Sequence, residues 1–151
     1  MQIAAAQMFE AFKPEKVEVV KAKGRLWMKV YKLNRLAKRE YPYFLTPRPA
    51  HFNVYLLLKD GEAVGYAAWN RLKDGTPVLR QIYVLPDCRR RGFGSFLFEE
   101  SRRMFSQSQT FYIEAPISES ALQMFSKLGY VEVVGEEIRG KNGVRFVFSG
   151  F

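Results

Sequence analysis

The chain has 151 residues, of which 48% are hydrophobic and 26% charged, and it contains a single cysteine. This length favours one domain with one core over residues 1–151, and the hydrophobic content excludes a disordered chain. One cysteine excludes an internal disulfide, and no hydrophobic run reaches the ~20 residues of a membrane-spanning helix. The N-terminus lacks a basic leader, so we expect no signal peptide and a cytoplasmic protein.

The net charge of +9 is concentrated in the first third of the chain. Residues 13–48 contain eleven Lys or Arg and three Glu, which gives +8 for this segment. A field of this sign favours acidic partners, such as nucleic acid, an acidic protein or an anionic cofactor.

The chain begins with an extension, residues 1–16, in which hydrophobic spacing favours a short helix that ends before Pro14. A first strand is predicted over 17–21. A helix is predicted over 25–40, because its hydrophobic residues fall on one helical stripe and its basic residues gather on another. The basic side of this helix is either exposed to solvent without a further role or binds an acidic substrate electrostatically.

Three consecutive strands are predicted over 52–59, 62–70 and 78–85, and they form an antiparallel meander. Asp60-Gly61 is a two-residue hairpin signal between the first two strands. The third is hydrophobic at most positions, as expected for a strand buried on both faces. The only histidine, His51, lies at a loop edge, and one His with one Cys cannot form a metal site, so no metal is expected.

The stretch after the third strand predicts an anion site. Its sequence from Arg89 to Ser95 is RRRGFGS, and it opens directly into a helical pattern that ends at residue 105. The first amides of a helix have no intrahelical acceptor and carry a partial positive charge. Two glycines allow close approach and three arginines add charge, so we expect a phosphate or pyrophosphate ligand. Neither the P-loop pattern nor the dinucleotide fingerprint fits. The alternative is an ordinary turn with solvated arginines.

A further strand is predicted over 110–115, and the strand-helix-strand order implies that it pairs in parallel with the strand over 78–85. Ser118 is the expected N-cap of a second helix, which Gly129 ends. The chain is predicted to close with a hairpin of strands 130–134 and 144–148, with Asn142-Gly143 in the turn.

Two motifs together resemble the GNAT acetyltransferase superfamily. Arg89-x-x-Gly92-x-Gly94, preceded by Val84-Leu85-Pro86, matches the acyl-CoA signature Arg/Gln-x-x-Gly-x-Gly/Ala and the strand end before it. Downstream, Ser118-x-x-Ala121-x-x-x-Phe125-x-x-x-Gly129-Tyr130 is similar to the family's Asn-x-x-Ala-x-x-x-Tyr-x-x-x-Gly-Phe. The resemblance runs from residue 17 to residue 148.

This resemblance implies an α/β (α+β) fold: a mixed, mostly antiparallel sheet of six to seven strands, helices on both faces, and a V-shaped splay between two central parallel strands. It implies an acetyl-CoA-dependent N-acetyltransferase in which a primary amine attacks the thioester directly. Main-chain amides of Ile82 and Val84 would hold the pantetheine, and those of residues 90–95 the pyrophosphate. The coenzyme-contacting residues implied in this way are Ile82, Tyr83, Val84, Arg89, Arg90, Arg91, Gly92, Phe93, Gly94, Ser95, Ser118 and Phe125.

Glu114 is the candidate base that accepts a proton from the amine. It matches the Glu at the end of the corresponding strand in members that acetylate protein N-termini. The alternative is a surface or paired carboxylate, since other members place the base on the central strand, where Val78 cannot serve.

The general acid is where this chain departs from the family, because Phe125 replaces the usual Tyr. A coenzyme thiol can leave as the anion, so the loss slows turnover without forbidding it. A substitute acid is left open among Tyr83, Tyr112 and Tyr130. Cys88, beside an arginine, is a weaker alternative as an acyl-carrying nucleophile.

The acceptor stays open between a protein amine, a small-molecule amine and an amine carried by nucleic acid. Two other functions compete with this one. One is a coenzyme-binding regulator without catalysis, and the other is a nucleic-acid-binding protein that uses the basic first third. We expect no membrane partner, and a monomer or homodimer.

Overall fold

A computed structural model describes residues 16–108, 110–114, 119–138 and 141–148, with side chains for all of these except 114, 119 and 132–148. The expected N-terminal helix within residues 1–16 lies outside this part of the chain, apart from Lys16. The described elements, in chain order, are β1 (Val17–Lys21), α2 (Leu26–Glu40), β2 (Asn53–Lys59), β3 (Glu62–Arg71), β4 (Pro77–Val84), the 3-10 turn η1 (Pro86–Cys88), α3 (Phe93–Phe105), β5 (Thr110–Glu114), α4 (Glu119–Lys127), β6 (Tyr130–Ile138) and β7 (Lys141–Phe148).

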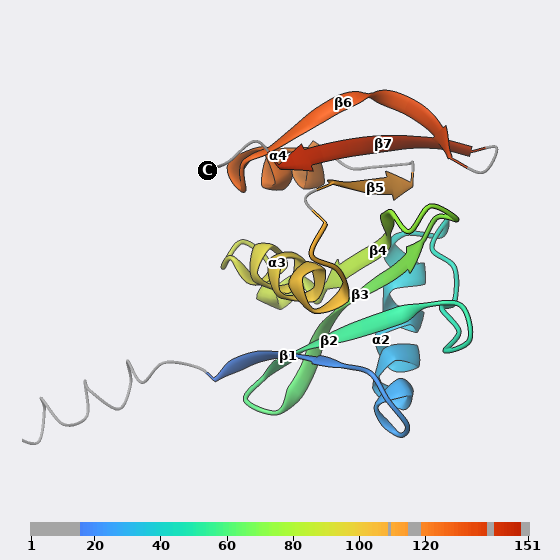
Figure 1. Cartoon of the computed structure of the whole chain (residues 1–151). Coiled ribbons are helices and arrows are strands. Elements are labelled where there is room, and N and C mark those ends of the chain that lie inside the picture. The colour runs from blue at the N-terminus through green and yellow to red at the C-terminus, as the bar shows by residue number, and fades with distance from the viewer. Residues whose placement is uncertain (1–15, 109, 115–118, 139–140, 149–151) are drawn as a thin grey trace, which may run out of the picture.

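The seven strands form one sheet in the order β1-β2-β3-β4-β5-β7-β6. β4 and β5 are its parallel pair, and among the described residues their register consists of Val78 with Tyr112 and Leu79 with Ile113. Beyond these residues the two strands diverge (Figure 1). The mixed, mostly antiparallel sheet with a splay between its central parallel strands confirms the predicted fold class.

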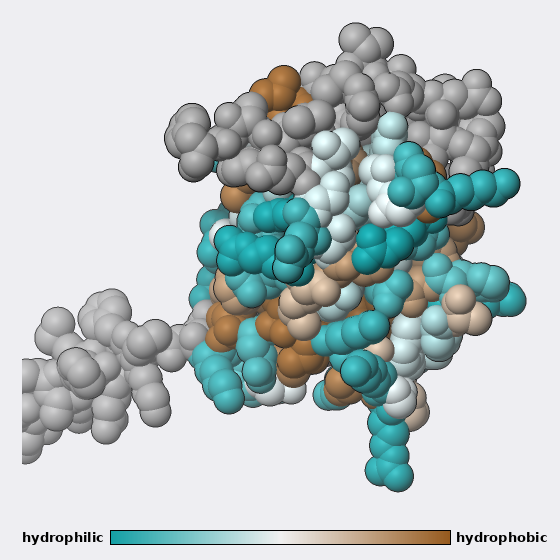
Figure 2. All heavy atoms as spheres, viewed as in Figure 1, coloured by the Kyte–Doolittle hydropathy of each residue, from teal (hydrophilic) through white to brown (hydrophobic). Residues whose placement is uncertain are grey.

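Helices cover both faces of the sheet and enclose two separate hydrophobic cores (Figure 1). On one face, α3 and α4 pack on Trp69 and Phe111, with Phe98 and Phe125 in ring contact at 4.8 Å between centroids. On the other face, α2 packs on alternate residues of β2 and β3, such as Tyr66. Figure 2 shows hydrophilic side chains over much of the described surface in this view. No described helix is long and apolar enough to cross a bilayer.

A buried polar network ties α2 and the segment after it to the centre of the sheet. The Asn34 side chain donates to the Leu45 carbonyl and to the Tyr66 hydroxyl, both at 2.9 Å. Tyr66 donates to Gln81 Oε1 at 2.8 Å, and Gln81 Nε2 donates to the same Leu45 carbonyl at 2.7 Å. Because buried polar groups are costly without partners, this closed set fixes the chain after α2 relative to β4.

Two turn predictions have opposite outcomes. Asp60 and Gly61 have φ of +50° and +83°, so the predicted two-residue hairpin turn is confirmed. The prediction that Asn142-Gly143 forms a turn is wrong, because both residues lie inside β7 and pair with Glu137 and Glu136 of β6. The last hairpin is longer than its hydrophobic pattern indicates, so pairing between the strands overrides the local turn preference of Asn-Gly.

Candidate functional site

The turn between β4 and α3 presents main-chain amides to an anion. Arg90 and Gly92 have left-handed φ of +62° and +83°. The first hydrogen bond of α3 runs from the Phe96 amide to the Gly92 carbonyl at 3.0 Å. Amides of residues 93–95 precede this bond, so they have no acceptor within the helix. Left-handed residues in such a turn also gather successive amides into a concave nest. The turn therefore has the geometry of an anion site.

Gly94 leaves space beside this turn that a side chain would fill. A Cβ placed on Gly94 would meet only Met124 Sδ, at 3.7 Å, which is an ordinary van der Waals contact. Gly94 and Met124 both line a pocket, so this Cβ would occupy pocket volume. The fold would therefore accept a side chain at this position. A ligand that approaches the α3 backbone closely would require glycine, because a Cβ would stand in its way.

The free edge of β4 faces the splay. The Leu85 amide donates to the Val64 carbonyl of β3 at 2.8 Å. The Tyr83 carbonyl also lies on the β3 side, since a Cβ on Gly65 would come within 2.7 Å of it. Because the hydrogen-bonding direction alternates along a strand, the amides of Ile82 and Val84 point to the opposite side. That side is the one from which β5 has diverged.

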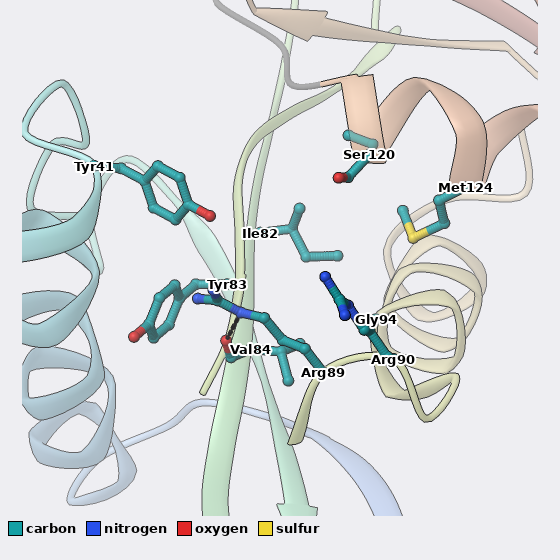
Figure 3. Close-up of a pocket in the computed structure, with 10 residues that line it drawn as sticks. Tyr41, Ile82, Tyr83, Val84, Arg89, Arg90, Gly94, Ser120 and Met124 are labelled. Atoms are coloured by element: carbon teal, nitrogen blue, oxygen red, sulfur yellow. Dashed lines mark hydrogen bonds between the residues drawn. The ribbon is translucent and has the colours of Figure 1, made fainter. Parts of the chain in front are cut away.

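Between these two sets of amides lies a pocket of about 410 Å³ (Figure 3). It is formed by the residue after α2, the end of β4, the turn, the start of α3 and one side of α4. A volume of this order is typical of ligand sites. The lining residues are Tyr41, Ile82, Tyr83, Val84, Arg89, Arg90, Gly94, Ser120, Ala121 and Met124.

The Arg89 side chain is occupied by protein groups. Its two Nη atoms donate to the two carboxylate oxygens of Glu40, and its Nε donates to the Val84 carbonyl at 2.9 Å. The guanidinium also lies 5.4 Å from the Tyr83 ring centroid. The hydrogen bond from Arg89 holds the pKa of Glu40 below its ordinary value, and the bond to Glu40 raises the pKa of Arg89. Arg89 therefore joins the end of α2 to the turn.

The sequence-predicted site residues fall into four groups. Ile82, Tyr83, Val84, Arg89, Arg90 and Gly94 line the pocket, and Arg91, Gly92, Phe93 and Ser95 belong to the turn and first turn of α3 beside it. Phe125 is fully buried in the core and does not line the pocket. Ser118 lies outside the described residues. Glu114 is the last residue of β5, and its side chain is outside the described part. The coenzyme and base roles of these residues stay predictions.

Sequence reasoning missed Tyr41, which directly follows α2. Figure 3 shows its hydroxyl directed toward the pocket near Ile82, whereas the Tyr83 hydroxyl points away toward α2. Burial raises the pKa of the Tyr41 hydroxyl, although the nearby Arg89 guanidinium opposes the shift. No short motif marks this residue, because its place in the pocket depends on how α2 packs on the sheet.

A family model for the acetyltransferase (GNAT) domain matches residues 27–148. Similar solved structures include Arabidopsis thaliana Naa50 in complex with the bisubstrate analogue CoA-Ac-MVNAL, with a TM-score of 0.63 and 17% identity over 89% of this chain and 99% of that one. Another is the diaminobutyrate acetyltransferase EctA from Paenibacillus lautus in complex with L-2,4-diaminobutyric acid and coenzyme A. Its TM-score is 0.65, with 13% identity over 91% of this chain and 98% of that one. A third is the ribosomal-protein-S18-alanine N-acetyltransferase from Escherichia coli, with a TM-score of 0.63 and 15% identity over 90% of this chain and 96% of that one. At these identities the likeness is one of fold. No curated protein sequence matches this chain.

Proposed function

This chain belongs to the GNAT acetyltransferase family, and on that premise we propose that it transfers an acetyl group from acetyl-CoA to a primary amine by direct attack. The observation that carries the proposal is the pocket that joins the free amide edge of β4 to the open amides of α3. An extended pantetheine arm can pair with the Ile82 and Val84 amides, as an added strand would. A diphosphate can then accept hydrogen bonds from residues 93–95.

Direct attack fits the residues better than a covalent acyl-enzyme. Cys88 is the only cysteine in the chain. The residue is buried, with 5% of its surface exposed, and does not line the pocket. A buried thiol that a thioester cannot reach cannot carry the acetyl group. We therefore infer that the amine attacks the acetyl carbon directly, in the splay between β4 and β5.

Acetyl-CoA should stabilise the protein and then be consumed in the presence of an amine. At 100 times its Kd, one bound ligand adds about 2.7 kcal/mol to the free energy of unfolding, which raises Tm by several degrees. Thermal unfolding with and without acetyl-CoA measures this shift, and thiol release over a panel of amines measures transfer. A Tm shift without thiol release on any amine would favour the coenzyme-binding regulator, and no shift would contradict the proposal.

The exposed side of α2 favours an acceptor that carries negative charge. The basic face consists of Arg25, Lys29, Lys32, Arg35 and Arg39, which are all exposed. None of them has an acidic partner within the described residues. Like charges three and four residues apart weaken a helix, so this face costs stability. Since α2 ends at the pocket beside Tyr41, the basic residues near this end add positive potential at the pocket.

Transfer to an acidic amine should therefore weaken with salt. Replacing Lys32 and Arg35 by glutamate should raise KM for an acidic peptide amine about 3- to 10-fold at low salt, with little change for a neutral amine. The control is Lys73→Glu, a single charge reversal at an exposed residue in the β3–β4 connection. Initial rates at several salt concentrations measure the effect. Equal responses of the acidic and the neutral amine would contradict this part of the proposal.

A further inference from the structure

A thiolate leaves faster from the acetyl group when a residue in the pocket can give a proton to its sulfur. Among the described residues that line the pocket, only Tyr41, Tyr83, Ser120 and the two arginines carry a polar hydrogen on the side chain. An arginine does not release its proton at ordinary pH, and a serine hydroxyl is a far weaker acid than a phenol. The choice is therefore between two tyrosines.

The two tyrosine hydroxyls point in different directions. Tyr83 is buried in the core under α2, and its hydroxyl points away from the pocket (Figure 3). Tyr41 directs its hydroxyl into the pocket near Ile82 (Figure 3). The Ile82 amide points to the β5 side of β4, as the β3–β4 hydrogen bonding indicates. Of the other two tyrosines considered from the sequence, Tyr130 packs against Phe98 and Phe111 in the opposite core and Tyr112 is half-buried in β5. Neither of them lines the pocket.

Tyr41 is held in place from three sides. Its amide donates to the Ala37 carbonyl at 2.7 Å, which makes it the C-cap of α2. Its ring stacks on Phe44 with centroids 5.1 Å apart and meets the Tyr83 ring edge-on at 6.4 Å. The residue before it, Glu40, is held by both Nη atoms of Arg89 in the turn. The turn between β4 and α3 is thus connected to the Tyr41 phenol through the Arg89–Glu40 ion pair.

Burial keeps the Tyr41 hydroxyl protonated by raising its pKa. Burial raises its pKa, the Arg89 guanidinium opposes this, and the Glu40 carboxylate and Tyr43 reinforce it, with a net shift above the ordinary value. The phenol is therefore neutral at the pH at which an acetyltransferase works, and it keeps a proton to donate even in mildly alkaline solution.

We propose that Tyr41 is the proton donor to the departing thiolate, and that Arg89 and Glu40 are its positioning residues. This inference rests on the proposed function. The amine nitrogen bonds to the carbonyl carbon, the carbon–sulfur bond breaks with its electron pair on sulfur, and the Tyr41 hydroxyl gives its proton to that sulfur. The amine loses one proton to a base or to water, and the phenolate regains one from water.

The test measures binding as well as turnover. At about pH 9.5 free coenzyme A is mostly thiolate, taking a thiol pKa of ~8.5, so a protonated Tyr41 can donate a hydrogen bond to it. Titration calorimetry at this pH should show coenzyme A bound about tenfold more weakly by Tyr41→Phe than by the wild type, since a hydrogen bond to a charged group is lost. Binding of acetyl-CoA, which has no thiolate, should be equal in both.

Tyr43→Phe is the matched control, because Tyr43 belongs to the same aromatic cluster but is 50% exposed and does not line the pocket. It should bind both ligands as the wild type does. With any amine that is turned over, Tyr41→Phe should lower kcat about tenfold and leave KM for acetyl-CoA unchanged, an effect at the low end for acid catalysis because a thiolate leaves readily.

Equal weakening of both ligands, or undiminished coenzyme A binding by Tyr41→Phe at pH 9.5, would overturn this inference alone. Failure of the wild type to bind either ligand would overturn the proposed function and this inference with it.

Discussion

Replacing Gly94 with alanine should weaken acetyl-CoA binding about 10- to 100-fold without destabilising the protein, a loss equivalent to one charge-assisted hydrogen bond. The added methyl group would lie in the pocket, where its nearest described neighbour is Met124 Sδ at 3.7 Å. It would separate the α3 amides from the diphosphate that we expect them to bind. The fold should tolerate it, because alanine is about 0.5–1 kcal/mol better than glycine inside a helix.

Gly75→Ala provides the opposite control. Gly75 lies in the β3–β4 turn away from the pocket and has φ of +91°, so alanine there should cost about 1–3 kcal/mol of stability. It should nevertheless bind acetyl-CoA with the wild-type Kd. Calorimetric Kd values and urea unfolding of the two variants separate binding from stability. If Gly94→Ala bound acetyl-CoA as tightly as the wild type does, the diphosphate would have to lie elsewhere.

The sequence predicts the architecture well where local rules decide it. Hydrophobic periodicity places α2 and the early strands to within about two residues, as is usual for element boundaries, and Asp60-Gly61 forms the expected turn. The glycine-rich turn can be predicted because close backbone approach and left-handed φ both favour glycine, and the glycines are visible in the sequence. In contrast, Asn142-Gly143 has the same local signal, and strand pairing overrides it.

The side chains that shape the pocket are predicted less well, because long-range packing decides them. The partner of Arg89 is Glu40, 49 residues earlier in the chain, and no spacing rule connects them. From the motif alone Arg89 reads as a coenzyme contact, whereas its side chain binds Glu40 and the Val84 carbonyl. The same ion pair holds the residue before Tyr41, whose side chain lines the pocket. Its role becomes visible only once α2 is placed against the end of β4.

Replacing Glu114 with glutamine should lower kcat/KM for amine acetylation about 10²- to 10⁴-fold at neutral pH, the usual contribution of a positioned base. The β4–β5 register ends at Ile113, so Glu114 is the first residue of β5 beyond it. By the alternation of the strand, position 114 shares a face with Tyr112, opposite to the core residues Phe111 and Ile113. That is the α2 face of the splay, the same face that carries Tyr41.

The pH dependence of this loss distinguishes a base from a structural carboxylate. Near neutral pH a lysine-like amine, with a pKa of ~10.4, is almost entirely protonated and needs a base, whereas above that pKa it arrives neutral. The deficit of Glu114→Gln should therefore be largest at neutral pH and shrink as the pH rises toward the pKa of the amine. A deficit that stayed constant with pH would indicate lost structure instead.

Glu62→Gln is the control for this experiment, since Glu62 is an exposed carboxylate at the start of β3, outside the pocket. It should keep wild-type rates at every pH, and both variants should keep the wild-type Kd for acetyl-CoA, because neither change touches the amides that we expect to hold it. Full activity of Glu114→Gln would mean that the amine reaches the splay already neutral or transfers its proton to another group. Another base would then be needed; the described residues that line the pocket include no carboxylate, and Glu40, next to the lining residue Tyr41, is already engaged by Arg89.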